Sequence, residues 1–210
     1  MKAFRPLLLT LALVLLAPVV TMSAPSRAVA TEPVAPVTAA DRVLGRADAP
    51  VTVIEYASFS CHHCADWHQF VFPLFKQRMI DTGQVRYVFR NLPTDPEQMS
   101  LSGAALARCA APDKFFDVAS ALMHGQGAVL RGGTLDAWYA PAIAASGRTR
   151  AQIETCIALP ATRAAIQRDI DSATAADVDS TPAFFVNGRR VTDRSLGGLE
   201  VAVRAAAAAR

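Results

Sequence analysis

The stretch that decides the fold is VTVIEYASFSCHHCADW, residues 51–67. Its first six residues are mostly β-branched or apolar, which predicts a buried strand over residues 51–56. Residues 58–60 form a short turn, and the apolar positions beyond it have helical spacing. We therefore expect a helix to begin at Cys61 and to be kinked by Pro73.

The rest of the chain repeats this strand character twice, on either side of a helical block. Alternation predicts a strand over residues 84–89, and the apolar residues 183–186 lead through the turn signal Asn187-Gly188 to a return strand at 190–192. Ala-rich periodic stretches predict helices over residues 97–111, 113–124, 134–145 and 149–175, with breaks at Pro112, at 125–133 and at Gly147, and a closing helix over 199–209 after Gly197-Gly198. This order predicts an α/β protein with an inserted helical domain.

The first 30 residues have the three parts of a secretory signal peptide. Lys2 and Arg5 are followed by an apolar run and by Ala28-Val29-Ala30, a small-residue cleavage site. We expect a signal peptide over 1–30 and a Pro/Ala/Thr-rich linker over 31–40. The main domain is then expected over 41–90 and 178–210, with the inserted helical domain over 91–177, and the mature protein is expected to be exported.

The charge balance excludes one class of function. The chain has 21 basic and 18 acidic side chains, and three of the basic ones, Lys2, Arg5 and Arg27, lie in the predicted leader. Without the leader, 18 basic residues face 18 acidic ones. A neutral chain argues against a protein that binds nucleic acid through phosphates.

The close cysteine pair, Cys61 and Cys64, carries the chemistry. A Cys-x-x-Cys motif at the start of a helix in a strand–helix–strand unit is typical of a redox site. Unpaired N–H groups and the helix dipole favour a thiolate at Cys61, so its pKa should fall, and Cys64 should resolve the mixed disulfide. His62 and His63 should stabilise the thiolate further, which makes the disulfide a stronger oxidant.

A metal site is the alternative for the same residues. Cys61, Cys64 and His68 have the spacing of soft ligands for zinc or copper. A structural zinc site would need a second ligand pair, and the sequence has no second Cys-x-x-Cys. The redox interpretation is therefore favoured, and it needs no cofactor.

Glu55 interrupts the buried strand and comes six residues before Cys61. A buried carboxylate is costly unless it has a partner or a function. One hypothesis is that Glu55 accepts the proton of Cys64 through water. The other is that it forms an ion pair with a Lys or Arg.

The distant cysteines, Cys109 and Cys156, both lie in predicted helices. A bridge between them would stabilise the fold by roughly 4 kcal/mol on the chain-entropy model. We expect this structural disulfide, with a second redox relay or two free thiols as the alternatives.

Three segments together resemble the DsbA-like family of exported thiol:disulfide oxidoreductases: ASFSCHHCADWH (57–68), FRNLP (89–93) and STPAFFVNGR (180–189). The resemblance implies a thioredoxin fold with an inserted helical domain. It implies that Cys61 is the nucleophile, Cys64 the buried resolving cysteine and Glu55 the buried acid, with His63 supporting the thiolate. It also implies that the Thr181–Pro182 bond is cis and that Thr181 offers backbone to the substrate. Family members often have Pro where this chain has His62.

The resemblance further implies a function. We expect a periplasmic oxidase that donates the Cys61–Cys64 disulfide to reduced exported polypeptides through a mixed disulfide at Cys61. A membrane partner of the DsbB type would reoxidise it, and we expect a monomer that binds no nucleic acid. The alternative is a reductase or isomerase with the same site. Residues 31–40 lack the heptads that an oligomerising segment would carry.

Overall fold

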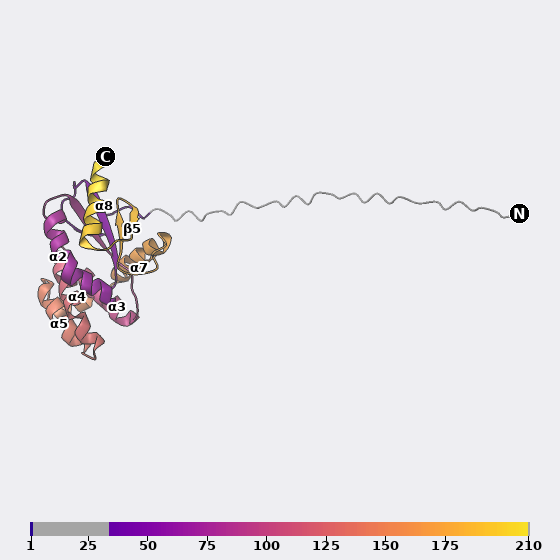
Figure 1. Ribbon diagram of the computed structural model, residues 1–210. Helices are drawn as coiled ribbons and strands as arrows, with labels where there is room; N and C mark the ends of the chain where they lie inside the picture. Colours follow the sequence, from indigo (N-terminus) through magenta and orange to yellow (C-terminus); the bar gives the residue numbers. More distant parts are fainter. Residues whose placement is uncertain (2–33, 210) are drawn as a thin grey trace. The chain divides into compact units, whose positions relative to one another are not determined.

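A five-stranded mixed sheet organises the chain in the computed structural model, which describes Met1 and residues 34–209. The strands are β1 (Arg42–Leu44), β2 (Val51–Ala57), β3 (Val85–Asn91), β4 (Ala183–Val186) and β5 (Arg189–Val191). They lie in the order β1-β3-β2-β4-β5, in which only the β2–β3 pair is parallel. The predicted order of strand, helix, strand, helical block, hairpin and helix is confirmed (Figure 1).

The N-terminal leader that the sequence predicts lies outside the described residues. Side-chain hydrogen bonds hold residues 34–41: Arg90 donates to the carbonyls of Ala35 and Pro36 and to the carboxylate of Asp41. In the described part of the chain, no helix combines the length and the apolar character that crossing a membrane requires.

Strand alternation gives β2 two different buried faces. Val51, Val53 and Ala57 join the larger core cluster, whereas Ile54 and Tyr56 join a smaller one that contains Ala173 at the end of α7 (Pro160–Ala175). Glu55 has the parity of Val53, so its side chain lies on the face with the larger cluster. That face is covered by the helical segment that begins after Cys61 and by α8 (Leu196–Ala208).

The helical segment after Cys61 is irregular. It consists of α1 (His62–Asp66), the wider π-type turns Trp67–Val71, α2 (Phe72–Phe75) and a second π-type stretch, Lys76–Ile80. Pro73 lies in the first turn of α2, directly after the first π-type stretch. Proline has no N–H to donate, so the regular pattern changes at this position.

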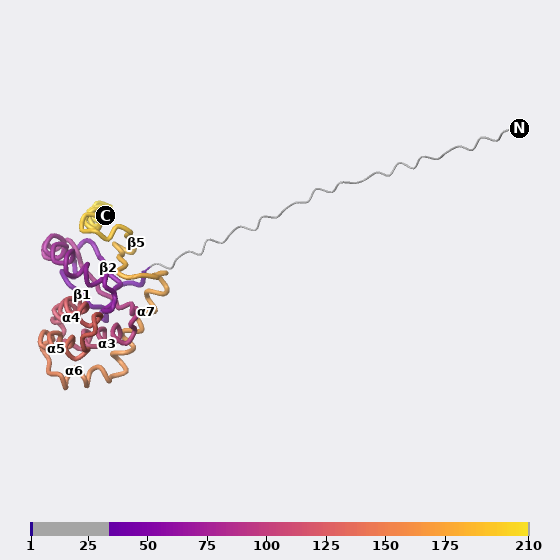
Figure 2. Tube along the Cα trace, turned by 60° about the horizontal axis from the view of Figure 1, so that its bottom comes forward, coloured from indigo at the N-terminus to yellow at the C-terminus, as the bar shows by residue number. Residues whose placement is uncertain are grey.

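The helical block consists of α3 (Glu97–Arg108), α4 (Phe115–Leu130), α5 (Leu135–Ala145), α6 (Arg150–Ile157) and α7. Figures 1 and 2 both place α3, α4 and α5 together at one end of the unit formed by residues 34–209, away from α8. Helix α4 contacts α1, so the block lies against the segment that carries the cysteine pair.

The break predicted at residues 125–133 is wrong for residues 125–130, because α4 continues to Leu130. Gly125 permits close packing here. A Cβ atom at this position would lie 2.8 Å from Cδ1 of Trp138 in α5. A glycine within a helix can therefore mark the close approach of a second helix, and periodicity alone does not distinguish this from a helix end.

Other predicted boundaries also need correction. The helix predicted over 149–175 is two helices, because Pro160 begins α7 after an extended Leu159. Helix α8 begins before Gly197-Gly198, with Ser195 as its N-cap. Strand β1 was not predicted, since three residues give too short a pattern. The turn at Asn187-Gly188 is present, with positive φ at both residues, and β5 begins one residue earlier than predicted.

Candidate active site

Cys61 lies at the end of the loop that connects β2 to α1. Cys61 is the N-cap of α1, with extended backbone, and its side chain forms no capping hydrogen bond. This places the sulfur beside the unpaired N–H groups of the first helical turn, as predicted. Cys61 is half-buried, and its Sγ lies 3.4 Å from the carbonyl oxygen of Thr181.

Both cysteines of the pair are thiols in this structure, and their proton affinities differ strongly. The pKa of Cys61 is lowered to about 5, chiefly by a hydrogen bond from the Cys64 thiol, against an opposing effect of burial. The Thr181 side chain and the backbone N–H groups of Cys64 and His63 lower it further. Burial raises the pKa of Cys64 well above its ordinary value, and the charges of Glu55 and Cys61 add to this. The site therefore holds one ready thiolate beside one thiol that keeps its proton.

Glu55 is fully buried on β2, and its Oε2 lies 3.0 Å from Nε2 of His68 and accepts a short hydrogen bond from the hydroxyl of Tyr87. The alternative hypothesis for Glu55, an ion pair with Lys or Arg, is wrong, whereas its role as a proton acceptor for Cys64 stays a prediction. Arg90, on the neighbouring strand, has the opposite parity and binds Asp41 on the other face of the sheet.

His68 follows Cys64 by four residues, so the two side chains lie on one face of the helical segment, above Glu55. Both His68 and Cys64 are buried. Among residues 34–209, no group of three or more His, Cys, Asp or Glu side chains could hold a metal ion. The alternative of a metal site at Cys61, Cys64 and His68 therefore has no support in the geometry.

His62 and His63 are both exposed, and their ring centroids lie 3.9 Å apart. The contribution of His63 to the low pKa of Cys61 comes through its backbone N–H. An effect of either imidazole on the thiolate stays a prediction.

Two sets of residues that the sequence did not single out hold the loop before Cys61. The Ser58 hydroxyl lies within hydrogen-bond distance of the hydroxyls of Ser60, Thr94 and Ser100. From the other side, the amide of Gln126 in α4 donates to the carbonyls of Phe59 and Cys61. Apart from the Ser58–Ser60 contact, these contacts join residues far apart in the chain, so no local pattern could have predicted them.

The Thr181–Pro182 peptide bond is cis, as the resemblance implied. Arg194, a residue not predicted, donates to the Pro182 carbonyl over 3.0 Å. The backbone carbonyl of Arg194 accepts a hydrogen bond from the Trp67 indole, 3.1 Å away. The cis-proline loop is therefore tied to the helical segment that carries the cysteines.

A shallow groove of about 300 Å³ runs beside the cysteine pair. Its lining consists of His63, Asp66, Trp67, Phe70, Val71, Pro182 and Arg194. Phe70 is 71% exposed, which is unusual for an aromatic side chain. The groove thus joins an apolar surface to the face that carries the Cys61 sulfur.

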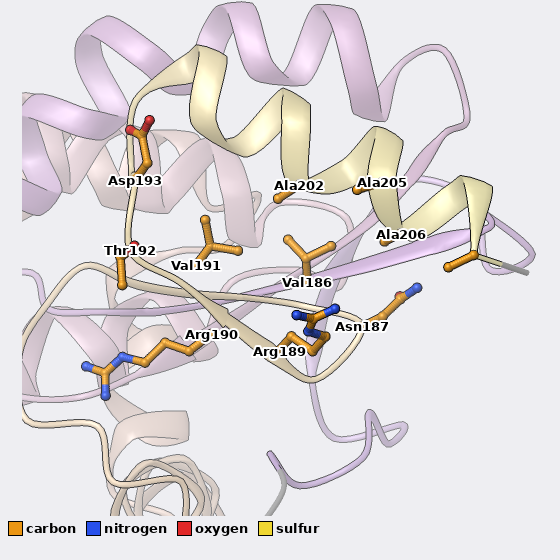
Figure 3. A pocket seen from close by; sticks show the side chains of 11 residues that line it. Val186, Asn187, Arg189, Arg190, Val191, Thr192, Asp193, Ala202, Ala205 and Ala206 are labelled. Carbon is orange, nitrogen blue, oxygen red and sulfur yellow. The ribbon is translucent and has the colours of Figure 1, made fainter.

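The two largest hollows described lie elsewhere. One of about 450 Å³ separates the β4–β5 hairpin from α8 and is lined by Val186, Arg189 and alanines of α8 (Figure 3). Another of about 680 Å³ lies between α3 and α7. Neither is lined by any residue predicted for the site.

The distant cysteines form a disulfide between Cys109, at the end of α3, and Cys156 in α6. Thr162 lies between these helices and donates to the Cys156 carbonyl. The disulfide joins two helices of the block.

Comparison with known proteins adds the family. A family model described as Thioredoxin matches residues 38–204.

This chain belongs to the thioredoxin family.

Two curated proteins are similar to parts of this chain. A putative protein-disulfide oxidoreductase of Rickettsia bellii is 42% identical over 69 residues, which is 33% of this chain and 26% of that protein. The Na(+)/H(+) antiporter NhaA 3 of Salinispora tropica is 34% identical over 153 residues, 71% of this chain and 22% of that protein. The chain thus spans about a quarter of the length of these relatives.

Solved structures match over most of the chain. Oxidised BdbD from Bacillus subtilis superposes with a TM-score of 0.75 at 20% identity, covering 84% of this chain and 96% of that one. Alpha-DsbA1 of Wolbachia pipientis gives 0.69 at 24% identity, with 83% and 94% covered. The predicted DsbA-like resemblance and the thioredoxin fold with a helical insertion are confirmed.

Proposed function

We propose that this chain is a protein thiol:disulfide oxidoreductase that oxidises exported polypeptides with its Cys61–Cys64 disulfide. The observation that carries the proposal is the contrast between the two thiols. Cys61 is half-exposed with a pKa of about 5, whereas Cys64 is buried with a raised pKa. A nucleophile and a resolving cysteine need these opposite properties.

The reaction starts from the oxidised site. A client thiolate attacks Cys61 Sγ, the Cys61–Cys64 bond breaks, and Cys64 leaves as a thiolate that takes up a proton because its pKa is raised. A second client thiolate then attacks the client sulfur of the mixed disulfide. The client disulfide forms, and Cys61 leaves as a thiolate. Two electrons pass from the client to the cysteine pair.

The direction of this exchange follows from the leaving group. A thiolate with a low pKa leaves faster and makes the reduced site more stable relative to the disulfide. The pKa of Cys61 lies about four units below its ordinary value of 9.0. This favours release of the disulfide to clients, the oxidase direction.

Glu55 is proposed to exchange the proton of Cys64. It is buried on the same face, its charge acts on Cys64, and its Oε2 is held by His68 and Tyr87. When the buried thiolate leaves, a proton must reach it from inside the protein, and the Glu55–His68 pair can supply one.

The groove beside the site is proposed to bind apolar segments of unfolded clients. The Pro182 and Thr181 backbone faces the Cys61 sulfur at one end, and Phe70 provides an exposed apolar surface at the other. Unfolded chains expose such apolar side chains, which would pack against Phe70 while their cysteine reacts.

Replacing Phe70 by serine tests the groove and the client class together. We expect the rate of oxidation of a reduced, unfolded client to fall by about tenfold, because the lost apolar contact contributes roughly 1–2 kcal/mol. The rate with reduced glutathione, which is too small to reach Phe70, should stay the same. Both rates are measured by stopped-flow fluorescence.

Val201→Ser is the matched control. Val201 is 61% exposed on α8 and does not line the groove. Equal client rates in wild type and Phe70→Ser would contradict the groove as the binding surface. Failure of the wild-type protein to oxidise any client would contradict the proposed function itself.

The proposed site of action is the periplasm, after removal of the N-terminal leader. The formed Cys109–Cys156 disulfide is in keeping with an oxidising compartment. A membrane partner of the DsbB type is proposed to reoxidise the pair Cys61–Cys64 after each cycle, with the protein acting as a monomer.

A further inference from the structure

The backbone just before α1 is held by a side chain from the helical block. Gln126, in α4, donates from the same Nε2 atom to the carbonyl of Phe59 over 2.9 Å and to the carbonyl of Cys61 over 3.0 Å. Its side chain is 1% exposed. The amide nitrogen of Gln126 thus donates to the carbonyls of the two residues that flank Ser60.

We propose that Gln126 is a positioning residue that fixes the backbone of Cys61 and thereby sets the proton affinity and the redox equilibrium of the active site. The proposal rests on the proposed function and assigns to the helical insertion a direct part in the redox chemistry.

The physical link is the orientation of the Cys61 sulfur. The thiolate is stabilised by the Cys64 thiol and by the N–H groups of His63 and Cys64, which all depend on where the N-cap residue lies. The Cys61 carbonyl already accepts from the N–H groups of Cys64 and Ala65, each over 3.1 Å. Gln126 adds a third donor from outside the helix and so fixes the plane of the peptide that follows Cys61.

Gln126 also acts on the charge distribution around the sulfur. A carbonyl oxygen carries partial negative charge, which opposes a thiolate nearby. The bonds to Gln126 hold the oxygens of Phe59 and Cys61 toward α4 and offset part of that charge. Without them, the Phe59 carbonyl loses its side-chain donor in a buried place, and the Cys61 carbonyl keeps only the N–H groups of Cys64 and Ala65.

A second glutamine serves as an internal comparison. Gln69, in the π-type stretch after α1, donates to the Met123 carbonyl of α4 over 3.3 Å. It joins nearly the same elements as Gln126 but does not touch the loop before Cys61. A role limited to packing would make the two glutamines equivalent.

The test compares Gln126→Leu with Gln69→Leu in the full reduced protein. In Gln126→Leu we expect the pKa of Cys61, measured from the ultraviolet absorbance of the thiolate, to rise by about one unit. The equilibrium with glutathione should then shift about tenfold toward the disulfide form, since one pKa unit corresponds to a factor of ten. Gln69→Leu should leave both quantities within about twofold of wild type.

Gln126→Glu covers the case in which the leucine variant does not fold. The carboxyl group has nearly the same shape but can donate at most one of the two hydrogen bonds, and none when ionised. We expect the pKa of Cys61 to rise here as well. A folded Gln126 variant with unchanged pKa and unchanged glutathione equilibrium would overturn the proposal, as would an equal shift in Gln69→Leu.

The outcome is separable from that of the proposed function. The pKa of Cys61 is measured without any client, so it reports on Gln126 even if the protein oxidises no polypeptide. Absence of client oxidation by the wild type would contradict the proposed function and leave the pKa comparison intact.

Discussion

Replacing Cys61 by alanine is expected to abolish oxidation of reduced clients, whereas replacing Cys64 by alanine is expected to trap clients that already carry a mixed disulfide with glutathione. Without Cys61 the half-exposed sulfur that meets the client is gone, and the buried Cys64 cannot be reached. Without Cys64, Cys61 can still form a mixed disulfide, for example with a client activated as a mixed disulfide with glutathione. No intramolecular thiol then resolves it.

Intact-mass spectrometry under non-reducing conditions distinguishes these results. Cys64→Ala should carry a covalently bound client that a reductant releases, and Cys61→Ala should carry none. The double variant Cys109→Ala/Cys156→Ala is the control for general loss of cysteines. It should retain client oxidation and lose roughly 4 kcal/mol of stability on the chain-entropy model.

The opposite pattern would contradict the assigned roles. If Cys61→Ala trapped clients and Cys64→Ala did not, the attacking sulfur would be Cys64. If the Cys109/Cys156 variant lost client oxidation while remaining folded, the disulfide in the helical block would take part in the chemistry.

The reduced protein is expected to be more stable than the disulfide form, by a margin that depends on pH. The pKa of Cys61 is lowered from 9.0 to about 5 in the folded reduced protein. Above about pH 9 the thiol is ionised in both folded and unfolded chains, and the stabilising contribution is complete. As the pH falls from about 9 to about 5, the unfolded chain binds the proton first, so the contribution declines and is lost below the folded pKa.

The pKa of Cys64 is raised, so this thiol stays protonated in the folded protein throughout the range. The disulfide form has no Cys61 thiol to titrate. Its small loop also gains little from restricting the unfolded chain.

Calorimetric melting of both redox forms measures this margin. The Tm of the reduced form should exceed that of the disulfide form at about pH 8, and the difference should shrink as the pH is lowered toward about 5. In Cys61→Ala the stability should lack this rise between about pH 5 and 9. A disulfide form that melts higher across the whole range would argue against an oxidase and for a reductant.

Much of the fold could be predicted because its signals are local. The buried strand β2 is a β-branched and apolar run interrupted by Glu55, and the N-cap position of Cys61 follows from the turn that ends this run. Asn187-Gly188 specifies a hairpin by its own backbone preferences. These features depend on residues within one element or turn.

The rest depends on contacts between distant elements. Glu55 contacts His68 because strand parity and helix spacing bring the two side chains to the same face of the sheet. The parity of Glu55, or the four-residue spacing between Cys64 and His68, could have suggested this pair. Gly125 lies inside α4, where the absence of a Cβ atom lets Trp138 of α5 pack against the helix. Gln126 lies 65 residues from Cys61, and no periodicity marks it.

The most direct test of the central claim, that the Cys61–Cys64 pair is a disulfide donor, is its equilibrium with a glutathione redox buffer. The fraction of reduced protein is measured by thiol alkylation and mass spectrometry at fixed pH. We expect a reduction potential of about −120 mV, the value of a strong oxidant, because the low pKa of Cys61 stabilises the reduced form. A reduction potential of about −270 mV would contradict the role of Cys61–Cys64 as a disulfide donor and identify the protein as a reductant.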